Sequence, residues 1–228
     1  MKIYILDAFH PAGVDFAARH AEVIRWDDPK VRHWAEEADG VMVRMTRIGA
    51  ADLARAKRLK VICKQGVGVD TIDLEAAKAR GIPVCRTPGV NSEAVAEMAF
   101  TLALSVARRV TEMDRMIRAG VKIERPNVLG IEMWRKTVGV VGLSAIGSRV
   151  AQKWVGAFDA SICFLDPQVS EVKYRKFSIL EEMLPEVDLL TLHLPLTPQT
   201  RGLIGKSEIA LMKPTAILVN TSRGGIVD

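Results

Sequence analysis

Two glycines and a serine stand where a phosphate-binding turn is chemically possible. Gly142, Ser144 and Gly147 follow an apolar segment, Thr137–Val141, and precede a segment with the apolar spacing of an amphipathic helix. The first turn of a helix has unpaired N–H groups and a positive dipole end, and both attract a pyrophosphate. Dinucleotide-binding proteins carry glycine at all three positions. The sequence therefore predicts a dinucleotide turn that departs from the usual pattern at Ser144.

Ser144 leaves two interpretations of this turn open. A side chain at the second position crowds the approach of the backbone to the pyrophosphate, which weakens binding. A serine hydroxyl could instead form a hydrogen bond with a phosphate oxygen. A strand–helix unit that binds no nucleotide is a third interpretation of the same pattern.

Asp166 follows the next strand-like segment, Ser161–Leu165. A carboxylate at the end of that strand accepts hydrogen bonds from the adenosine ribose hydroxyls and repels a 2′-phosphate. Strand, turn, helix, strand and acid thus occur in the order that dinucleotide binding requires. The pattern predicts NAD rather than NADP as the cofactor.

Short apolar segments alternate with helix-compatible segments along the chain, which predicts parallel sheets covered by helices on both faces. After Asn91 or Ser92 as a cap, apolar residues recur at helical spacing almost to Gly120, so we expect one long helix that bridges two domains. The other expected helices are Ala50–Arg58 and Asp73–Arg80, and the expected strands are Lys2–Leu6, Val23–Trp26, Val41–Val43, Leu59–Cys63, Ile82–Cys85, Thr137–Val141, Ser161–Leu165, Leu189–Leu192 and Ala216–Val219.

The composition argues against several classes of protein. The 228-residue chain has 32 basic and 27 acidic residues with a net charge of +5, and because the charges are interspersed we expect no nucleic-acid partner. The apolar segment at the N-terminus is too short for a secretory signal, and Glu97 interrupts the apolar segment Ala94–Ala107. We therefore expect no membrane association.

The cysteines and histidines do not predict a metal site. Cysteines occur in strand-like segments and in no Cys-x-x-Cys pair, so we expect them to be reduced and buried in a cytoplasmic protein. No histidine in the first domain has a partner at metal-ligand spacing. The residues concerned are Cys63, Cys85, Cys163, His10, His20 and His33.

The chain contains four longer motifs, which are GVGVDTIDLEAAKARGIPVCRTPGVNSEAVAEMAFTLAL from Gly66, KTVGVVGLSAIGSRVAQ from Lys136, VDLLTLHLPLTPQTRGLI from Val187 and LVNTSRGGIVD from Leu218. Together they resemble the D-specific 2-hydroxyacid dehydrogenases, the family of phosphoglycerate dehydrogenase and glyoxylate or hydroxypyruvate reductase. The resemblance implies an α/β fold with a flavodoxin-like substrate domain over residues 1–98. It also implies a Rossmann-type NAD-binding domain over residues 99–228, entered through the long helix at 91–120, with doubly wound parallel sheets in both domains.

The resemblance also implies a reaction and a set of site residues. The reaction is NAD-dependent oxidation of the CH–OH group of a D-2-hydroxy acid, or reduction of a 2-oxo acid, by a cytoplasmic homodimer whose long helix lies at the subunit contact. Main-chain N–H groups of one loop would hold the substrate carboxylate, other residues would contact the cofactor or border its nicotinamide, and an arginine would be catalytic. The loop residues are Val67, Gly68 and Val69, and the cofactor contacts are Ala145, Ile146 and Asp166. The residues that border the nicotinamide are His193, Leu194, Pro195, Thr221 and Ser222, and the catalytic arginine is Arg223.

Two arginines have the chemistry to recognise such a substrate. The guanidinium of Arg223 would bind a planar carboxylate or polarise a carbonyl that gains negative charge as hydride arrives. Arg44 ends a short strand of the first domain, where a substrate-side cation and a solvated surface residue are equally consistent with the sequence.

The chain ends at Asp228, before the segment in which the family has its catalytic glutamate and its acid/base histidine. We therefore expect a chain whose C-terminal part is missing, either an experimental fragment or a natural truncation. A repurposed activity and a non-catalytic binding or assembly role are alternatives to dehydrogenase activity. In a repurposed enzyme His193 could be the acid/base, whereas the resemblance implies that it lines the pocket.

Overall fold

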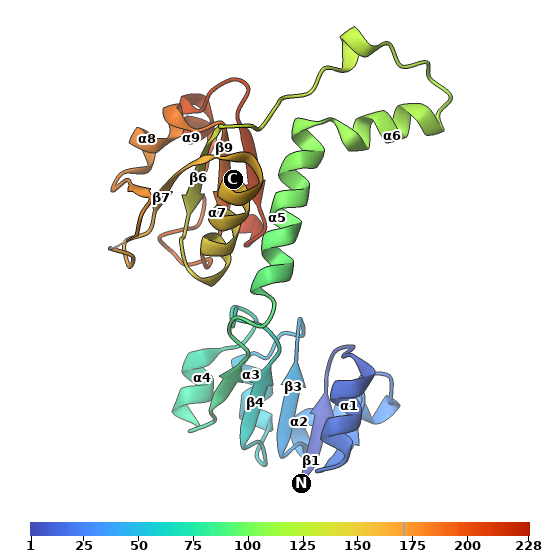
Figure 1. Ribbon diagram of the computed structural model, residues 1–228. Coiled ribbons are helices and arrows are strands. Elements are labelled where there is room, and N and C mark those ends of the chain that lie inside the picture. The colour runs from blue at the N-terminus through green and yellow to red at the C-terminus, as the bar shows by residue number, and fades with distance from the viewer. Residues whose placement is uncertain (171) are drawn as a thin grey trace. The chain divides into compact units, whose positions relative to one another are not determined.

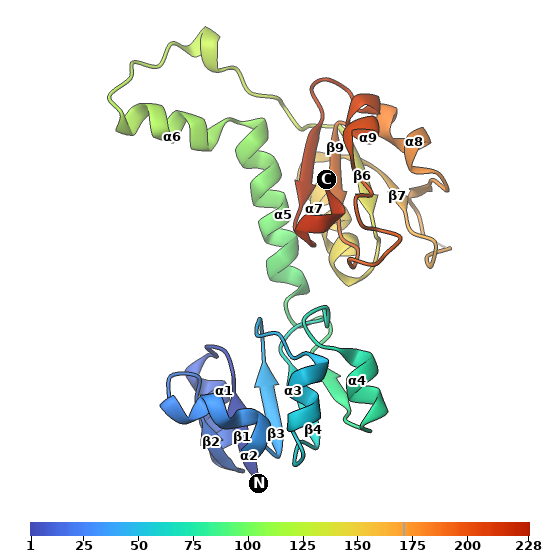
Figure 2. The ribbon, with the colours of Figure 1, turned by 180° about the vertical axis from the view of Figure 1, so that it is seen from behind.

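The computed structural model describes residues 1–170 and 172–228, and its chain divides into two compact units, Met1–Val90 and Asn91–Asp228. Each unit is built on a sheet of five parallel strands with helices in the connections, which confirms the predicted α/β class. Figures 1 and 2 show the two units from opposite sides. No helix among the described residues is long and apolar enough to cross a membrane.

The first unit has the strand order β2-β1-β3-β4-β5, which is the flavodoxin-like order predicted for it. Apolar residues of β1, β3 and β4 pack against α3 and α4 to form its core. The elements are β1 (Lys2–Ile5), α1 (Pro11–Ala18), β2 (Glu22–Ile24), the 3₁₀ helix η1 (Pro29–His33), α2 (Trp34–Glu37), β3 (Gly40–Val43), α3 (Ala50–Arg55), β4 (Val61–Lys64), α4 (Leu74–Ala79) and β5 (Val84–Arg86).

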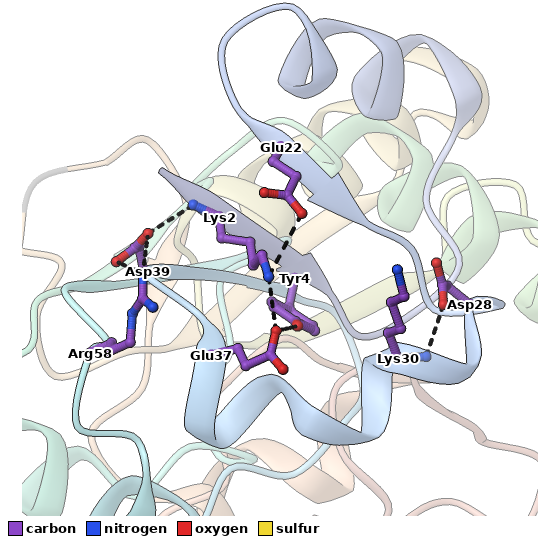
Figure 3. A network of polar contacts seen from close by, with 8 residues as sticks. All are labelled: Lys2, Tyr4, Glu22, Asp28, Lys30, Glu37, Asp39 and Arg58. Atoms are coloured by element: carbon purple, nitrogen blue, oxygen red, sulfur yellow. Dashed lines mark hydrogen bonds and ion pairs between the residues drawn. The ribbon is translucent and has the colours of Figure 1, made fainter.

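Polar contacts join the amino ends of β1 and β3 (Figure 3). The Lys2 main-chain N–H donates to Asp39 at 2.8 Å, and the Lys2 ammonium bonds to Glu37 at 2.9 Å. The buried Tyr4 hydroxyl donates to the same Glu37 oxygen at 2.9 Å, and Arg58 contacts Asp39 at 3.4 Å. Burial and the bond to Glu37 raise the pKa of Tyr4 to about 12. This cluster fixes the end of the sheet opposite the strand ends that carry the site residues.

The second unit has the strand order β10-β9-β6-β7-β8. The chain first adds β7 and β8 on one side of β6 and then adds β9 and β10 on the other side of β6. This is the Rossmann arrangement. Its elements are α5 (Ser92–Ala107), α6 (Val110–Arg118), η2 (Arg125–Val128), β6 (Thr137–Val141), α7 (Ala145–Phe158), β7 (Ser161–Leu165), β8 (Arg175–Lys176), α8 (Leu180–Met183), η3 (Leu184–Glu186), β9 (Leu189–Leu192), α9 (Lys206–Leu211), β10 (Ile217–Asn220) and η4 (Gly224–Ile226).

Helices cover both faces of this second sheet. On one face α5 and α7 pack against β6 and β10, and Trp154 of α7 contacts Phe100 of α5 with tilted rings whose centroids lie 4.6 Å apart. On the other face, α8 and η3 bury Met183 and Leu184 against the sheet. Within this unit α6 projects away from the sheet in both views (Figures 1 and 2), and none of its residues is buried.

The single helix expected over 91–120 is wrong, because the structure has two helices there, α5 and α6. Arg109 adopts a left-handed conformation with φ of 53°, which ends the helical path. Its guanidinium bonds to Glu112 at 2.6 Å and to the carbonyl of Asn127 at 2.9 Å. Contacts across the turn therefore stabilise a break that the continuous apolar spacing did not predict.

The expectation of three buried cysteines is correct only for Cys163. Cys63 and Cys85 lie in strands β4 and β5 as expected, but their side chains are exposed. Alternation along β4 places Ile62 and Lys64 on the buried side and Cys63 on the opposite side of the sheet. The apolar sequence therefore predicted both strands correctly, but the expectation that both faces of these strands are buried is wrong.

Candidate functional site

The glycine turn and Asp166 are joined by a hydrogen bond in the second unit. The main-chain N–H of Leu143, between Gly142 and Ser144, donates to Asp166 Oδ2 at 2.8 Å. The other carboxylate oxygen accepts the N–H of Gln168 at 2.9 Å, and Asp166 is 8% exposed. Each oxygen of a carboxylate accepts more than one hydrogen bond. The carboxylate thus stands beside the turn and retains acceptor capacity for ribose hydroxyls.

Backbone atoms lie so close to Gly142 and Gly147 that neither position has room for a side chain. Gly142 has φ of +86°, and a Cβ there would lie 2.5 Å from the carbonyl oxygen of His193. A Cβ on Gly147 would overlap the carbonyl oxygen of Gly142 and lie 3.0 Å from Val140. Only glycine permits these approaches of helix α7 and the loop after β9 to the turn. The turn has the shape that brings the start of a helix close to a pyrophosphate.

Ser144 fits this turn without backbone strain. Its φ of −78° is accessible to any residue, and it precedes the first residue of α7 as the N-cap. The hydroxyl makes no capping hydrogen bond, and the side chain is exposed, as is that of Ala145. Ile146 is partly buried against the core behind the turn. Ser144, Ala145 and Ile146 therefore lie together at the start of α7, where the free N–H groups of a helix bind anions.

The loops after β9 and β10 meet at the same edge of the sheet. Ser222 connects them, because its hydroxyl donates to the carbonyl of Leu192 at 2.6 Å and accepts the N–H of Leu194 at 3.2 Å. The carbonyl of Pro195 accepts the Thr200 hydroxyl at 2.7 Å, which fixes the rest of the first loop. The order in which strands are added to the sheet switches from one side of β6 to the other between β8 and β9, so β6 and β9 flank a topological switch point. Ligands of open α/β sheets bind at such a point.

Two buried polar atoms at this edge have no hydrogen-bond partner among the described residues, His193 Nδ1 and Thr221 Oγ1. The other ring nitrogen of His193 bonds to Thr191 Oγ1 at 2.8 Å. Leaving a buried polar atom unpaired costs about 1–3 kcal/mol, so such atoms indicate a ligand or water. The polar edge of a nicotinamide carboxamide fits a site with one imidazole nitrogen and one hydroxyl.

Burial lowers the pKa of the His193 imidazole to about 4. The group is therefore neutral at neutral pH and a poor proton donor there. This favours the pocket-lining role over the acid/base role considered for it from the sequence.

Arg223 lies in the loop after β10, next to Ser222. Its backbone carbonyl accepts the side-chain amide of Asn220 at 2.8 Å, and Asn220 also accepts the N–H of Ser222 at 2.9 Å. One Nη of Arg223 donates to the Ser222 carbonyl at 2.9 Å, and the side chain is partly buried. The Asn220 side chain therefore fixes the backbone conformation at Ser222 and Arg223.

In the first unit, the residues predicted to bind substrate follow β3 and β4, which are neighbours in the sheet. Arg44 is exposed, and its main-chain N–H donates to Asp7 at 2.6 Å. Its carbonyl accepts the ammonium of the buried Lys64. Burial alone would raise the pKa of Asp7, but hydrogen bonds from Arg44 and Thr46 outweigh this and lower it. A carboxylate after β1 and a lysine of β4 thus fix the backbone of Arg44.

The loop Val67–Val69 begins at Gly66, whose φ of +113° turns the chain away from β4. The Gly66 N–H donates to Thr87 Oγ1 at 2.8 Å, and the Thr87 N–H donates back to the Gly66 carbonyl at 3.1 Å. At its other end, the Val69 carbonyl accepts the Ile72 N–H at 2.9 Å. Both ends of the loop are held by hydrogen bonds, and its first residue, Val67, is exposed.

Sequence reasoning missed three residues that support these loops: Asp7, Lys64 and Asn220. Asp7 had a signal, because a carboxylate directly after the first apolar strand lies at the same sheet edge as the other strand ends. Lys64 and Asn220 had only the weaker signal of a polar residue at the last position of an apolar strand. The described residues contain no cluster of three metal-ligating side chains.

Two family models match the chain. The NAD binding domain of D-isomer specific 2-hydroxyacid dehydrogenase matches residues 100–228, and the catalytic domain of the same family matches residues 3–163. The chain belongs to the D-isomer specific 2-hydroxyacid dehydrogenase family. Members of this family are NAD-dependent oxidoreductases of D-2-hydroxy acids, and that assignment is favoured over a repurposed or non-catalytic module.

Similar proteins and solved structures support this family assignment. The chain is 38% identical to glyoxylate reductase of Aeropyrum pernix over 100% of its own length and 72% of that protein. It is 39% identical to D-3-phosphoglycerate dehydrogenase of Mycobacterium bovis, with 99% of this chain and 44% of that protein covered. The crystal structure of D-lactate dehydrogenase from Aquifex aeolicus, complexed with NAD and lactic acid, matches with a TM-score of 0.86 and 28% identity over 100% of this chain and 71% of that one.

Proposed function

We propose that residues 142–147 and Asp166 bind NAD(H), and that His193, Leu194, Pro195, Thr221 and Ser222 border the nicotinamide. The observation that carries the proposal is the hydrogen bond from the Leu143 N–H to Asp166, since it holds a carboxylate beside the turn. That carboxylate disfavours a 2′-phosphate by charge repulsion. The cofactor, when bound, supplies or accepts the hydride.

Arg223 binds the acid and stabilises charge in this proposal. A guanidinium has five donors in a planar fork, which suits a carboxylate and a carbonyl oxygen that becomes negative. In the first unit, main-chain donors of Val67, Gly68 and Val69 hold the substrate carboxylate, and Arg44 supplies a further cation. The reaction is the reduction of a 2-oxo acid or its reverse, and the substrates to test are glyoxylate, hydroxypyruvate and larger 2-oxo acids.

Calorimetric titration tests the cofactor assignment. The wild-type chain is expected to bind NADH more tightly than NADPH, and Asp166→Asn is expected to narrow the difference because the negative charge is lost. Asp159→Asn is the matched control, since Asp159 is an exposed aspartate at the far end of α7. Tighter binding of NADPH by the wild type, or no binding of NADH at millimolar concentration, contradicts the assignment.

NADH oxidation with each 2-oxo acid tests the role of Arg223. Arg223→Lys keeps the charge but removes the fork, so kcat/KM is expected to fall by about 10²–10³. Arg175→Lys changes an exposed arginine on the edge strand β8 of the same unit and is expected to have no effect. Equal turnover by wild type and Arg223→Lys contradicts the role.

A second proposal is that two copies associate through α5 and α6 as a homodimer. Exposed apolar side chains gather on these helices and on the segment that follows them: Met98, Leu102, Val106, Val110, Ile117, Leu129 and Trp134. A groove of about 540 Å³ lies among α5, the start of α6 and Trp134. An apolar surface of this extent favours a protein partner. A second copy presents the same apolar face, and a two-fold contact pairs such a face with itself.

Sedimentation at micromolar concentration tests the dimer. Val106→Glu combined with Trp134→Glu is expected to give monomers, because charges would be buried at the contact. Phe16→Glu replaces an exposed aromatic residue of the first unit and is expected to leave the dimer intact. A wild-type monomer under these conditions contradicts the proposal.

We also propose that the protein is cytoplasmic. Its three cysteines are free thiols, which is typical of a reducing compartment. Fractionation of cells that express the tagged chain tests this location.

A further inference from the structure

Two exposed cysteines are paired across neighbouring strands of the first unit. Cys63 of β4 and Cys85 of the edge strand β5 are register partners in parallel strands. Both side chains are exposed. Neighbouring strands lie about 4.8 Å apart, inside the Cα separation of about 4.4–6.8 Å found in disulfides. The backbone therefore already has a spacing that a disulfide accepts.

We propose that Cys63 and Cys85 form a dithiol modification site, which a low-molecular-weight disulfide such as oxidised glutathione converts reversibly into an internal disulfide. One cysteine thiolate attacks a sulfur of the small disulfide, whose S–S bond breaks and releases one small thiol. The other cysteine thiolate attacks the mixed disulfide and releases the second small thiol. Two electrons pass from the protein to the small disulfide, and the two protons of the cysteine pair end on the two released thiols.

The internal disulfide is expected to be easily reduced. Exposed disulfides are among those that small thiols reduce readily, and both cysteines are exposed.

The cysteine pair lies close to the Val67–Val69 loop, which holds the substrate in the proposed function. The expected effect of oxidation on substrate binding rests on that proposed function. Residues 66 and 87 follow β4 and β5, and they exchange the two hydrogen bonds that hold the start of the Val67–Val69 loop. A bridge between Cys63 and Cys85 shifts the two strands toward each other just before that point. We expect oxidation to change KM for the 2-oxo acid while the Kd of NADH, bound by the other unit, stays the same.

Non-reducing peptide mapping after treatment with oxidised glutathione tests the site on the wild-type chain. The expected result is one cross-linked peptide pair that contains Cys63 and Cys85, in a protein that has lost the mass of two hydrogen atoms and regains it with reduced glutathione. Cys163→Ser is the matched control and is expected to behave like the wild type, since burial raises the pKa of Cys163 to about 11. Cys63→Ser and Cys85→Ser are expected to stop at the mixed disulfide. A wild-type chain that stops at the mixed disulfide, or links to Cys163, overturns the site.

Steady-state kinetics and hydrogen exchange of the amides at Gly66–Val69 test the link to the loop. Slower exchange and a changed KM in the oxidised chain support it. A cross-linked peptide with unchanged exchange and unchanged KM overturns the link and retains the modification site. A reduced chain without turnover on any 2-oxo acid overturns the proposed function alone, because the mapping result does not depend on activity.

Discussion

Replacing Gly142 with alanine is expected to destabilise the second unit and to abolish tight NADH binding. The residue has φ of +86°, a conformation that costs a residue with a Cβ about 1–2 kcal/mol. The new Cβ would lie 2.5 Å from the His193 carbonyl oxygen and 2.8 Å from its carbonyl carbon. That backbone cannot retreat freely, since the His193 N–H donates to Val141 at 2.8 Å.

The size of the effect follows from these terms. Overpacking costs about 1–3 kcal/mol, and the lower entropy of the unfolded alanine chain returns about 0.4–1 kcal/mol. The free energy of unfolding of the second unit is therefore expected to fall by about 2–4 kcal/mol. Gly156→Ala is the matched control, because Gly156 lies within α7 with nothing within 4 Å of the new Cβ. It is expected to stabilise the same unit by about 0.5–1 kcal/mol.

Native-state hydrogen exchange in increasing urea measures this effect separately in each unit. Amides of β6 and β9 are expected to lose protection in Gly142→Ala, whereas those of β1 and β3 keep it. Calorimetry with NADH gives the second readout. If Gly142→Ala exchanges its β6 amides at the wild-type rate and binds NADH with the wild-type Kd, the steric reasoning about the turn is refuted.

Three further predictions concern single groups. Ser144→Gly is expected to weaken NADH binding about tenfold or more, since the unbonded hydroxyl is available to a phosphate oxygen; tighter binding in calorimetry would mean that the side chain crowds the phosphate. The hydrogen bond from the Lys2 ammonium lowers the pKa of Glu37, so its stabilisation is present above the unfolded value near 4.5 and is lost as the pH falls through the lower folded pKa. Urea unfolding of Lys2→Met, which removes this bond, is expected to show a smaller decline in stability from pH 7 to pH 3 than the wild type. NMR titration of the His193 ring is expected to give a midpoint near 4, and a midpoint at the ordinary 6.5 would contradict its burial.

Local patterns predicted most of the fold, because apolar segments long enough to cross a sheet are visible in sequence. The strands from Lys2–Ile5 to Ile217–Asn220 agree with expectation within a few residues. Strand β8 was missed because it has only two residues, Arg175 and Lys176, and both are charged. The break at Arg109 was missed because it depends on a contact with the distant Asn127 carbonyl, which no local pattern encodes.

The candidate site shows the same division. The places of Gly142 in a turn and of Asp166 at a strand end could be predicted, because a turn with positive φ and a carboxylate after an apolar strand leave signals at fixed positions. The supporting contacts of Asp7 and Lys64 depend on which strands are neighbours in the sheet, and this order appears only when the chain folds. The exposure of Cys63 was unpredictable for a related reason, since an apolar strand does not reveal which of its faces is covered.

The strand order of both sheets affects how the chain folds during synthesis. In each unit the first strand made is an interior one: β1 pairs with β2 and β3, and β6 pairs with β7 and β9. The strands β6, β7 and β8 can therefore pair as they leave the ribosome, while the other side of β6 stays open until β9 is made. An unpaired apolar strand edge is prone to aggregation. Slow translation between β8 and β9 would prolong that exposure.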